Sequence, residues 1–397
     1  MADTPPAAPL SPSLSPGGFL LNAGGAFAAL LGLVWLWVLA MPLAFLDPEY
    51  PSWLAKQQLL AACDTRGLLI LGDSRAATGV MPALLPVQAT NLAVGGGKAI
   101  EALAAFDRAL RCPTRPQRIV LSLDAVHFTR PDLFWERAAR FGFVDGGEIA
   151  TLRRVSHELG DLSLYELKDS GGPPPLLRDA LYRIGFPALY AGSLLKGGLA
   201  LRLPRNRRAL HMGLAARGHY FFGTAGGSGA VAADAHLRGF QPLPVLIWYF
   251  DRLLERAEAA GVGIDFLAMP MNDATAREVD PAVRHAFRAW LATREAKHPG
   301  FRVLGEVMPH WPDRFFGDGF AHLNPEGAAR FSAGLASCLA PAGLPASGLD
   351  PVTLDPACVQ RLQAAPPSTQ NEAQNGWFKD TGPDASASVA PISKRGS

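Results

Sequence analysis

The chain has 397 residues, of which 37 are Lys or Arg, 35 are Asp or Glu, and 49% are hydrophobic. That length accommodates one large domain or two smaller ones, and the apolar content excludes wholesale disorder. The net charge of +2 excludes the strongly basic balance of a typical nucleic-acid-binding protein, and a chain with one long uncharged apolar segment is not a multi-span transporter.

The N-terminal segment has no charged side chain between Asp3 and Asp47. Residues 1–18 are rich in Pro, Ser and Ala, a composition typical of disordered chain. Residues 19–46 are apolar and long enough for a helix to cross the roughly 30 Å hydrocarbon core of a bilayer. A cleaved signal peptide is the alternative, but its apolar core is shorter and follows positive charge. No Lys or Arg precedes this segment, so we predict an uncleaved transmembrane helix over residues 19–46.

An alternation of strands and helices follows the apolar segment. Short apolar stretches predict five strands, over residues 67–71, 90–92, 118–123, 263–268 and 301–304. Apolar residues at helical spacing predict four helices, over residues 99–110, 243–260, 274–297 and 324–339. This alternation indicates a parallel sheet with right-handed crossovers. We therefore predict an α/β fold with a five-stranded parallel, doubly wound, flavodoxin-like sheet in the order 2-1-3-4-5.

The predicted domain covers residues 60–340 and contains a long interruption. Residues 128–242 separate the third strand from the next helix and are too long for a plain loop. We interpret them as an insertion subdomain that covers the functional edge of the sheet. Residues 341–397 are rich in Pro, Ala, Ser and Gln, which predicts a mostly disordered tail.

The four cysteines are Cys63, Cys112, Cys338 and Cys358. None forms a CxxC motif or a zinc-type cluster with His, so the sequence predicts no metal site. Cys63 and Cys112 precede strands that are neighbours in the predicted order, which makes a disulfide between them reasonable. A second disulfide, Cys338–Cys358, would hold the start of the tail. Two disulfides would indicate an oxidising compartment, and four unpaired buried thiols are the alternative.

A Gly-Asp-Ser-Arg motif directly follows the first predicted strand. In open α/β sheets, ligands bind at the carboxyl ends of the strands, so Ser74 is a candidate nucleophile whose own N–H faces a developing oxyanion. Asp73 is a candidate for contacting the oxyanion or the substrate. The alternative is that Ser74 or Asp73 only caps a helix. Arg75 is adjacent to the nucleophile and is a candidate substrate-binding residue, with a surface salt bridge as the more common role.

A second candidate is His322, which follows the fifth strand at the same edge of the sheet. A neutral His can accept the proton of a Ser hydroxyl while a carboxylate orients the ring. The alternative is a His at the start of a helix.

Further polar or glycine-rich turns follow the second and fourth strands. The segment from Asn91 to Gly97 contains three consecutive glycines, which allow backbone N–H groups to approach a substrate. Asn91 itself is a candidate for contacting the oxyanion or the substrate, and a flexible turn is the alternative. Asn272 follows the fourth strand and is a candidate for lining the site or for a turn.

Together these motifs resemble the SGNH/GDSL hydrolase superfamily. The resemblance covers two stretches, roughly residues 65–125 and 241–340. It implies that Ser74 is the nucleophile, His322 the general base and Asp318 the residue that orients it. It also implies that the Gly96 N–H stabilises an oxyanion beside the Ser74 N–H.

The sequence departs from that superfamily at two points. The family spaces its acid and base as Asp-x-x-His, whereas Asp318 lies one residue earlier; on a helical turn it still reaches His322, and Asp313 is the substitute. The oxyanion Asn after the third strand is replaced by a stretch containing Asp124 and His127, which are candidates for lining the site.

The layout of one span, a Gly-Asp-Ser-Arg motif and a long insertion resembles membrane-anchored proteins of bacterial envelope acylation, such as alginate O-acetylation proteins and the D-alanyl transfer protein of teichoic acids. The resemblance implies a single-pass bacterial inner-membrane protein with its C-terminal domain in the periplasm. It implies transfer of an acyl group, most simply acetyl, from a membrane-bound O-acyltransferase partner to an exopolysaccharide acceptor such as cellulose. No cofactor and no nucleic-acid partner are expected. The alternatives are a glycan acetyl-esterase and a non-catalytic subunit of a polysaccharide synthesis complex.

Overall fold

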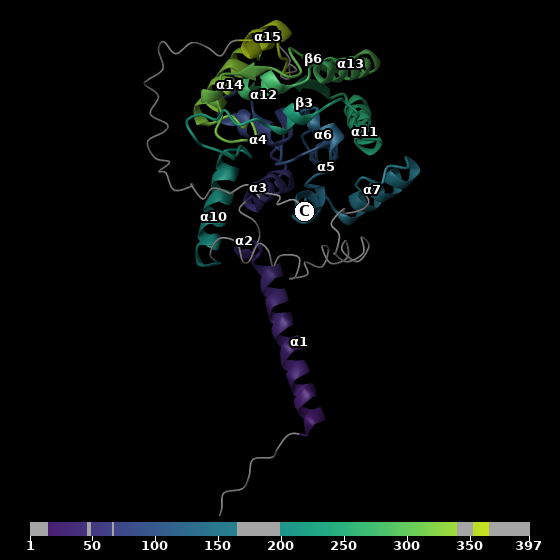
Figure 1. Ribbon diagram of the computed structural model, residues 1–397, viewed down its shortest axis with the longest axis vertical. Coiled ribbons are helices and arrows are strands. Elements are labelled where there is room, and N and C mark those ends of the chain that lie inside the picture. The colour runs from purple at the N-terminus through teal and green to yellow at the C-terminus, as the bar shows by residue number, and fades with distance from the viewer. Residues whose placement is uncertain (1–14, 46–48, 66, 165–198, 340–351, 365–397) are drawn as a thin grey trace, which may run out of the picture. The chain divides into compact units, whose positions relative to one another are not determined.

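The computed structural model describes residues 15–45, 49–65, 67–164, 199–339 and 352–364 (Figure 1). Most of the two segments predicted to be disordered, residues 1–18 and 341–397, lies outside the described residues. Within the second of these segments, residues 352–364 are described, and Pro356–Ala364 forms a helix, α15. That part of the tail is therefore structured, because Val359 and Leu362 are buried and a disulfide joins Cys358 to Cys338.

The N-terminal apolar segment forms helix α1, Pro16–Ala40, in which Ser15 Oγ accepts a hydrogen bond from the Gly18 N–H. Its Pro16–Trp37 stretch is the one described segment long and apolar enough to cross a membrane, and none of its apolar core is buried inside the protein. The helix ends at Met41 because the following residue is a proline, which disfavours helical backbone in its predecessor. A four-residue helix, α2, follows over Pro42–Phe45. The single helix predicted over residues 19–46 is thus two helices.

The central sheet has the predicted architecture. Its strands are β1 Gly67–Gly72, β2 Ala89–Asn91, β3 Pro116–Ser122, β4 Gly263–Leu267 and β6 Phe301–Leu304. All neighbours are parallel, and their order is β2-β1-β3-β4-β6. The stretches Leu68–Leu71 of β1, Ile119–Leu121 of β3 and Phe266–Leu267 of β4 are apolar and buried, as expected for a parallel sheet that is covered on both faces. This order confirms the predicted five-stranded doubly wound sheet.

The helices around the sheet are α3 Tyr50–Ala61, α4 Ser74–Gly79, α5 Ala99–Ala109, α11 Pro244–Ala260, α12 Asp273–Glu278, α13 Pro281–Lys297 and α14 Pro325–Cys338. Helices α5, α11 and α14 confirm the predictions over residues 99–110, 243–260 and 324–339, whereas α3 was not predicted. The helix predicted over residues 274–297 is divided into α12 and α13, because Asp280 caps a new helix whose first residue is Pro281. A second small parallel sheet pairs β5 Met271–Asn272 with β7 His310–Trp311. Strands of two residues leave no periodic pattern, and the sequence does not predict them.

The insertion over residues 128–242 packs into the same hydrophobic core as the sheet. Its described elements, together with the short α6 that precedes them, are α6 Val126–Thr129, η2 Phe134–Ala139, α7 Gly146–Glu158, α10 Leu199–Ala215 and η4 Ala233–His236. Phe128, Phe143 and Leu152 are fully buried members of that core. Helix α7 packs against α11, and α10 packs against α3 and α2. The described insertion residues are therefore continuous with the main fold.

Both predicted disulfides are present. Cys63 is bonded to Cys112, with Cα atoms 5.4 Å apart, and Cys338 is bonded to Cys358, with Cα atoms 5.3 Å apart. The first joins the chain segments that precede the neighbouring strands β1 and β3, and the second attaches α15 to the end of α14.

Candidate active site

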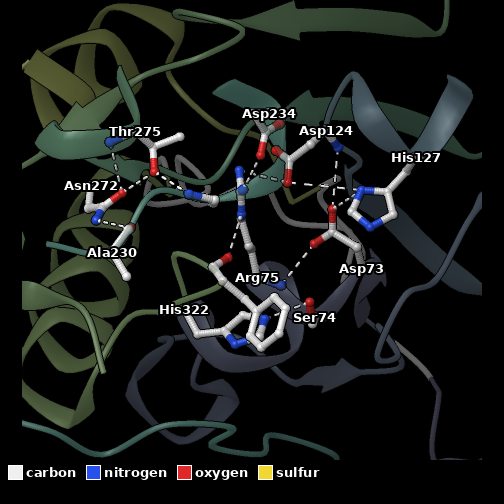
Figure 2. Close-up of polar contacts among 12 residues, drawn as sticks. Asp73, Ser74, Arg75, Asp124, His127, Ala230, Asp234, Asn272, Thr275 and His322 are labelled. Carbon is white, nitrogen blue, oxygen red and sulfur yellow. Dashed lines mark hydrogen bonds and ion pairs between the residues drawn. The ribbon is translucent and has the colours of Figure 1, made fainter. Parts of the chain in front are cut away.

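Ser74, His322 and Asp318 form a continuous chain of hydrogen bonds at the carboxyl end of the sheet. Ser74 Oγ is in hydrogen-bond contact with His322 Nε2 (Figure 2), at 2.7 Å, and His322 Nδ1 lies 2.6 Å from Asp318 Oδ2. With Asp318 ionised, the Nδ1–H donates to the carboxylate, which leaves Nε2 to accept the Ser74 proton. The geometry is that of a nucleophile, a general base and an orienting acid.

The turn at the end of β1 presents Ser74. Gly72 has a φ of +141°, and a Cβ at this position would overlap the Ser122 carbonyl oxygen, so the turn requires glycine. Asp73 is the N-cap of α4: its Oδ1 accepts hydrogen bonds from the Arg75 and Ala76 N–H groups. Ser74 is therefore the first residue of a helix, where its own N–H has no acceptor within the helix.

A tight loop positions the acid and the base. Asp318 Oδ1 accepts hydrogen bonds from the Phe320 N–H at 2.9 Å and the His322 N–H at 3.3 Å, and the Gly317 N–H donates to the His322 carbonyl. Ala321 adopts a left-handed φ of +59°. Asp318 thus reaches His322 as predicted, but through a loop folded around its carboxylate and not through a helical turn. The substitute, Asp313, is elsewhere, with its Oδ1 on the Ala274 N–H.

The surroundings of Asp318 favour its ionised form. Burial by itself raises the pKa of the carboxyl group, but the hydrogen bond and the charge of His322, together with the two backbone N–H donors, outweigh burial and hold the pKa below its usual range. An ionised Asp318 keeps the proton of the imidazole on Nδ1, which is the tautomer that the base requires.

Asp73 and Arg75 belong to a buried polar network behind the nucleophile (Figure 2). Asp73 Oδ2 accepts a hydrogen bond from the Asp124 N–H and lies 3.1 Å from His127 Nδ1. Burial raises the pKa of Asp73, but His127, Arg75 and the Ala76 N–H lower it to about 2. Asp73 is fully buried, so its carboxylate holds the turn and is not available to a substrate.

Arg75 links four parts of the chain. Its Nη1 lies 2.8 Å from Asp124 Oδ2, its Nη2 forms an ion pair with Asp234 of the insertion, and its Nε donates to the Phe320 carbonyl. Burial by itself lowers the pKa of Arg75. The charges of Asp124, Asp234 and Asp73 outweigh burial, so the net pKa is raised and the guanidinium stays charged. Arg75 is 5% exposed. The alternative of a surface salt bridge is therefore wrong, because the ion pairs of Arg75 are buried, and its role as a substrate ligand stays a prediction.

The two candidate asparagines also have internal roles. Asn91 Nδ2 donates to the Ala76 and Val80 carbonyls, and its Oδ1 accepts from the Ala93 N–H. Asn272 caps α12, and its Nδ2 donates to two carbonyls of the insertion. Both side chains are completely buried. They support the loops around the site and present no polar atom to a substrate.

The glycine-rich loop lies against the nucleophile turn. The Val94 N–H donates to the Gly72 carbonyl at 3.0 Å, and Gly96 has a φ of +70°. Among the described residues, no hydrogen bond engages the N–H of Gly96 or that of Ser74. Leu133 contacts the position where a Gly96 Cβ would be and itself has a left-handed φ of +68°. Leu133 had no signal in the sequence, and its strained backbone is a feature often found at functional sites.

The insertion supplies an aromatic side chain to the site. The Phe222 ring is stacked on the His322 imidazole, with ring centroids 4.8 Å apart. The backbone that leads to it is held on α4: the Tyr220 N–H donates to the Ala77 carbonyl, and His219 Nε2 lies 2.7 Å from the Thr78 carbonyl oxygen. Burial lowers the pKa of His219 to about 4, so this ring is neutral and donates its N–H. The insertion therefore reaches the edge of the sheet at which it was predicted to lie.

Asp73, Asp124 and His127 could each offer one ligand atom to a metal, with those atoms within 4.8 Å of one another. Arg75 already provides the positive charge at this position, with Nη1 2.8 Å from Asp124 Oδ2. The donor set therefore fits an internal ion-pair network better than a cation site. Burial, which outweighs the attraction of Arg75, raises the pKa of Asp124 well above its usual range.

No protein-family model matches the chain, and no curated protein matches it. What distinguishes the site is its own geometry: a serine at the start of a helix, a histidine in hydrogen-bond contact with it, and an ionised carboxylate behind the histidine.

Proposed function

We propose that the protein is a membrane-anchored serine acyltransferase of the SGNH type, which transfers an acyl group, most simply acetyl, to hydroxyls of a bacterial exopolysaccharide such as cellulose. The observation that carries this proposal is the hydrogen-bonded chain from Ser74 Oγ through His322 to Asp318. Ser74 is 248 positions from His322 in sequence, and Asp318 is four positions from His322. The three residues nevertheless meet at the edge of the sheet where open α/β folds bind ligands.

In the first step, Ser74 Oγ attacks the carbonyl carbon of the acyl donor while His322 Nε2 accepts the hydroxyl proton. A tetrahedral intermediate forms, and its oxyanion is stabilised by the unengaged N–H groups of Ser74 and Gly96. When the intermediate collapses, the bond to the donor oxygen breaks and His322 returns its proton to that oxygen. The product is an acyl ester on Ser74.

In the second step, a sugar hydroxyl takes the place of the leaving group. His322 removes its proton, the hydroxyl oxygen attacks the acyl carbonyl, and the Ser74 ester bond breaks as Oγ recovers the proton. Asp318 stabilises the transient imidazolium in both steps. If water attacks in place of the sugar, the same acyl-enzyme yields free acid, so transfer and hydrolysis differ only in the acceptor.

Two features of the chain, its disulfides and its apolar N-terminal helix, support a periplasmic location for the domain. Two disulfides are expected in an oxidising compartment, and α1 is apolar and long enough to anchor the chain in the inner membrane. An acceptor polymer emerging at the membrane surface and a membrane-bound O-acyltransferase that supplies acyl groups would both lie within reach of such an anchored domain.

The test is labelling of the full chain in detergent with a serine-directed fluorophosphonate. We expect one labelled residue, Ser74, and no labelling of Ser74→Ala or His322→Ala. Ser337→Ala is the matched control, because this serine is exposed on α14 and its hydroxyl contacts the Gly334 carbonyl and Cys358 Sγ and not His322. A folded wild-type chain that takes no label at Ser74 would refute the nucleophile and favour a non-catalytic subunit.

A second measurement separates transfer from hydrolysis. The labelled acetyl group of a soluble activated ester is followed with and without a cello-oligosaccharide acceptor. Acetylated sugar, formed at the expense of acetate and absent for Ser74→Ala, is the result expected of an acyltransferase. Acetate alone in both reactions would identify the site as that of an esterase.

A further inference from the structure

Helix α10 is unusually basic. Its 17 residues include four arginines and a histidine but no Asp or Glu. Arg202 is buried, whereas the side chains of Arg205, Arg207 and Arg208 are exposed. We call these three residues the arginine face. An exposed arginine on a helix can pair with an acidic side chain three or four residues away, and α10 contains no acidic residue.

The arginine face lies at the level where the chain leaves the apolar helix α1. Helix α10 packs against α2, which begins two residues after α1 ends. Asn206 is buried in this contact, and its Nδ2 donates to the Leu43 carbonyl at 2.9 Å. Because Asn206 is flanked in sequence by Arg205 and Arg207, the arginine face is within one helical turn of Leu43.

The length of α1 sets the depth of Leu43. The Pro16–Trp37 stretch has 22 residues, or about 33 Å of helix, which matches a hydrocarbon core of roughly 30 Å. Leu43 comes six residues after Trp37. A headgroup layer is about 5–8 Å thick, so a chain anchored by α1 holds Leu43, and with it Asn206, in or just above the headgroup layer.

No described carboxylate competes for the arginine face. The helices on which α10 packs, α2 and α3, contain no Asp or Glu. Glu49, between them, is engaged by Arg137 at 2.8 Å and by the Trp53 indole N–H. Three positive charges around the exposed side of one helical turn, at headgroup depth, are complementary to an anionic membrane surface.

We propose that the arginine face binds the headgroups of anionic phospholipids beside the membrane anchor. The inference requires α1 to span a membrane and is independent of the proposed acyl transfer. It has a consequence for the site: α10 leads directly into the segment that carries Tyr220 onto α4 and Phe222 onto His322. A headgroup contact on α10 therefore holds the catalytic edge at a set height and orientation above the bilayer.

The test uses the full chain in nanodiscs of phosphatidylcholine, alone or with about one third phosphatidylglycerol. Arginines are modified with phenylglyoxal, and the rate at each position is read by mass spectrometry. We expect modification of the arginine face to slow several-fold when phosphatidylglycerol is present and to recover at high salt, as screening requires. Exposed Arg277 on α12 is the internal control, and its rate is expected to be the same in both nanodiscs.

A matched pair of variants tests the same surface without chemical modification. One variant carries Arg205→Gln, Arg207→Gln and Arg208→Gln, and its control carries Gln at three exposed arginines of other elements, Arg154, Arg252 and Arg277. Each basic residue near an anionic surface strengthens binding about fivefold. The first variant should therefore lose up to roughly a hundredfold in its preference for phosphatidylglycerol over phosphatidylcholine in native mass spectrometry.

Two results would overturn the proposal. Equally fast modification in the two nanodiscs would show that the arginine face does not contact headgroups. Equally slow modification in both would show that something other than anionic lipid covers the arginine face, such as a protein partner or an acidic polymer. Thermal unfolding of the triple variant in the same nanodiscs verifies that its fold is intact.

Discussion

Replacing Asp318 with Asn isolates the step on which the proposed chemistry depends. The substitution preserves shape, but one of the two oxygens becomes an NH₂ group. Asp318 Oδ1 accepts the Phe320 and His322 N–H groups, and Oδ2 accepts the His322 ring N–H. If the NH₂ group faced the backbone, two hydrogen bonds would be replaced by opposed donors, at a cost of roughly 2–4 kcal/mol. The Asn carbonyl should therefore stay on the backbone and turn its NH₂ toward His322.

That orientation inverts the imidazole tautomer. Nδ1 becomes the acceptor, Nε2 carries the proton, and Ser74 Oγ loses its base. We expect the rate of Ser74 acylation to fall by about 10³–10⁴-fold, equivalent to roughly 4–5.5 kcal/mol of transition-state stabilisation. The assay is the burst of an activated acetyl ester and the rate of fluorophosphonate labelling, both measured on the full chain.

Asp313→Asn is the matched control, because Asp313 also accepts a backbone N–H but does not contact His322. We expect the control to retain activity within about threefold, the scatter of a modest change in local hydrogen bonding. The reasoning is refuted if Asp318→Asn keeps more than a tenth of the wild-type rate while remaining folded, or if both variants lose activity equally.

Three further predictions concern the oxyanion loop, a buried lysine and a disulfide. Gly96→Ala should lower the acylation rate about a hundredfold, since the φ of Gly96 is +70° and the new Cβ meets Leu133 at 3.0 Å. The control is Gly142→Ala, which has a similar φ of +67° but no neighbouring atom at the Cβ position, and it should lower stability only. Equal acylation rates for the two variants would contradict the oxyanion role. Burial outweighs the charge of Glu49 and lowers the pKa of Lys56 from 10.5 to about 7. Above about pH 7 the unfolded chain therefore binds more protons than the folded chain. In urea denaturation, the free energy of unfolding of the wild type should rise by about 2–3 kcal/mol between about pH 7 and 9 relative to that of Lys56→Met. Parallel pH dependences for the two proteins would contradict the lowered pKa of Lys56. Removing the Cys63–Cys112 disulfide, which closes 49 residues, should lower the free energy of unfolding by about 4 kcal/mol, whereas an unchanged denaturation midpoint would count against it.

The sheet and the catalytic pair follow from local patterns. Strands β1, β3 and β4 each contain a short apolar stretch because both faces of a parallel sheet are covered, and these stretches are readable one at a time. Once the strands are placed, the topology brings the residues after β1 and those after β6 to one edge. Ser74 and His322 therefore meet for a reason that the sequence contains, as do the cysteines that precede neighbouring strands.

The predictions that differ from the structure, such as the start of α13 and the role of Arg75, have local causes in some cases and long-range causes in others. Pro281 preceded by Asp280 was a readable signal for the start of α13. The ion pair between Arg75 and Asp234, by contrast, joins residues 159 positions apart with no motif around the second. Nothing local distinguishes a buried arginine of this kind from one that binds substrate.

The sequence by itself determined the order of strands and the pair of residues that meet at the sheet edge, because apolar periodicity and parallel topology are properties of segments. It made the two disulfides reasonable but left four unpaired thiols as an alternative. Only the tertiary structure decided what each remaining polar side chain does. Asp318 orients His322 while Asp313 does not, and Asn91 supports backbone where a substrate contact was expected. A hydrogen bond requires its partner within about 3 Å, and which carbonyl or carboxylate arrives at that distance is set by the packing of distant segments.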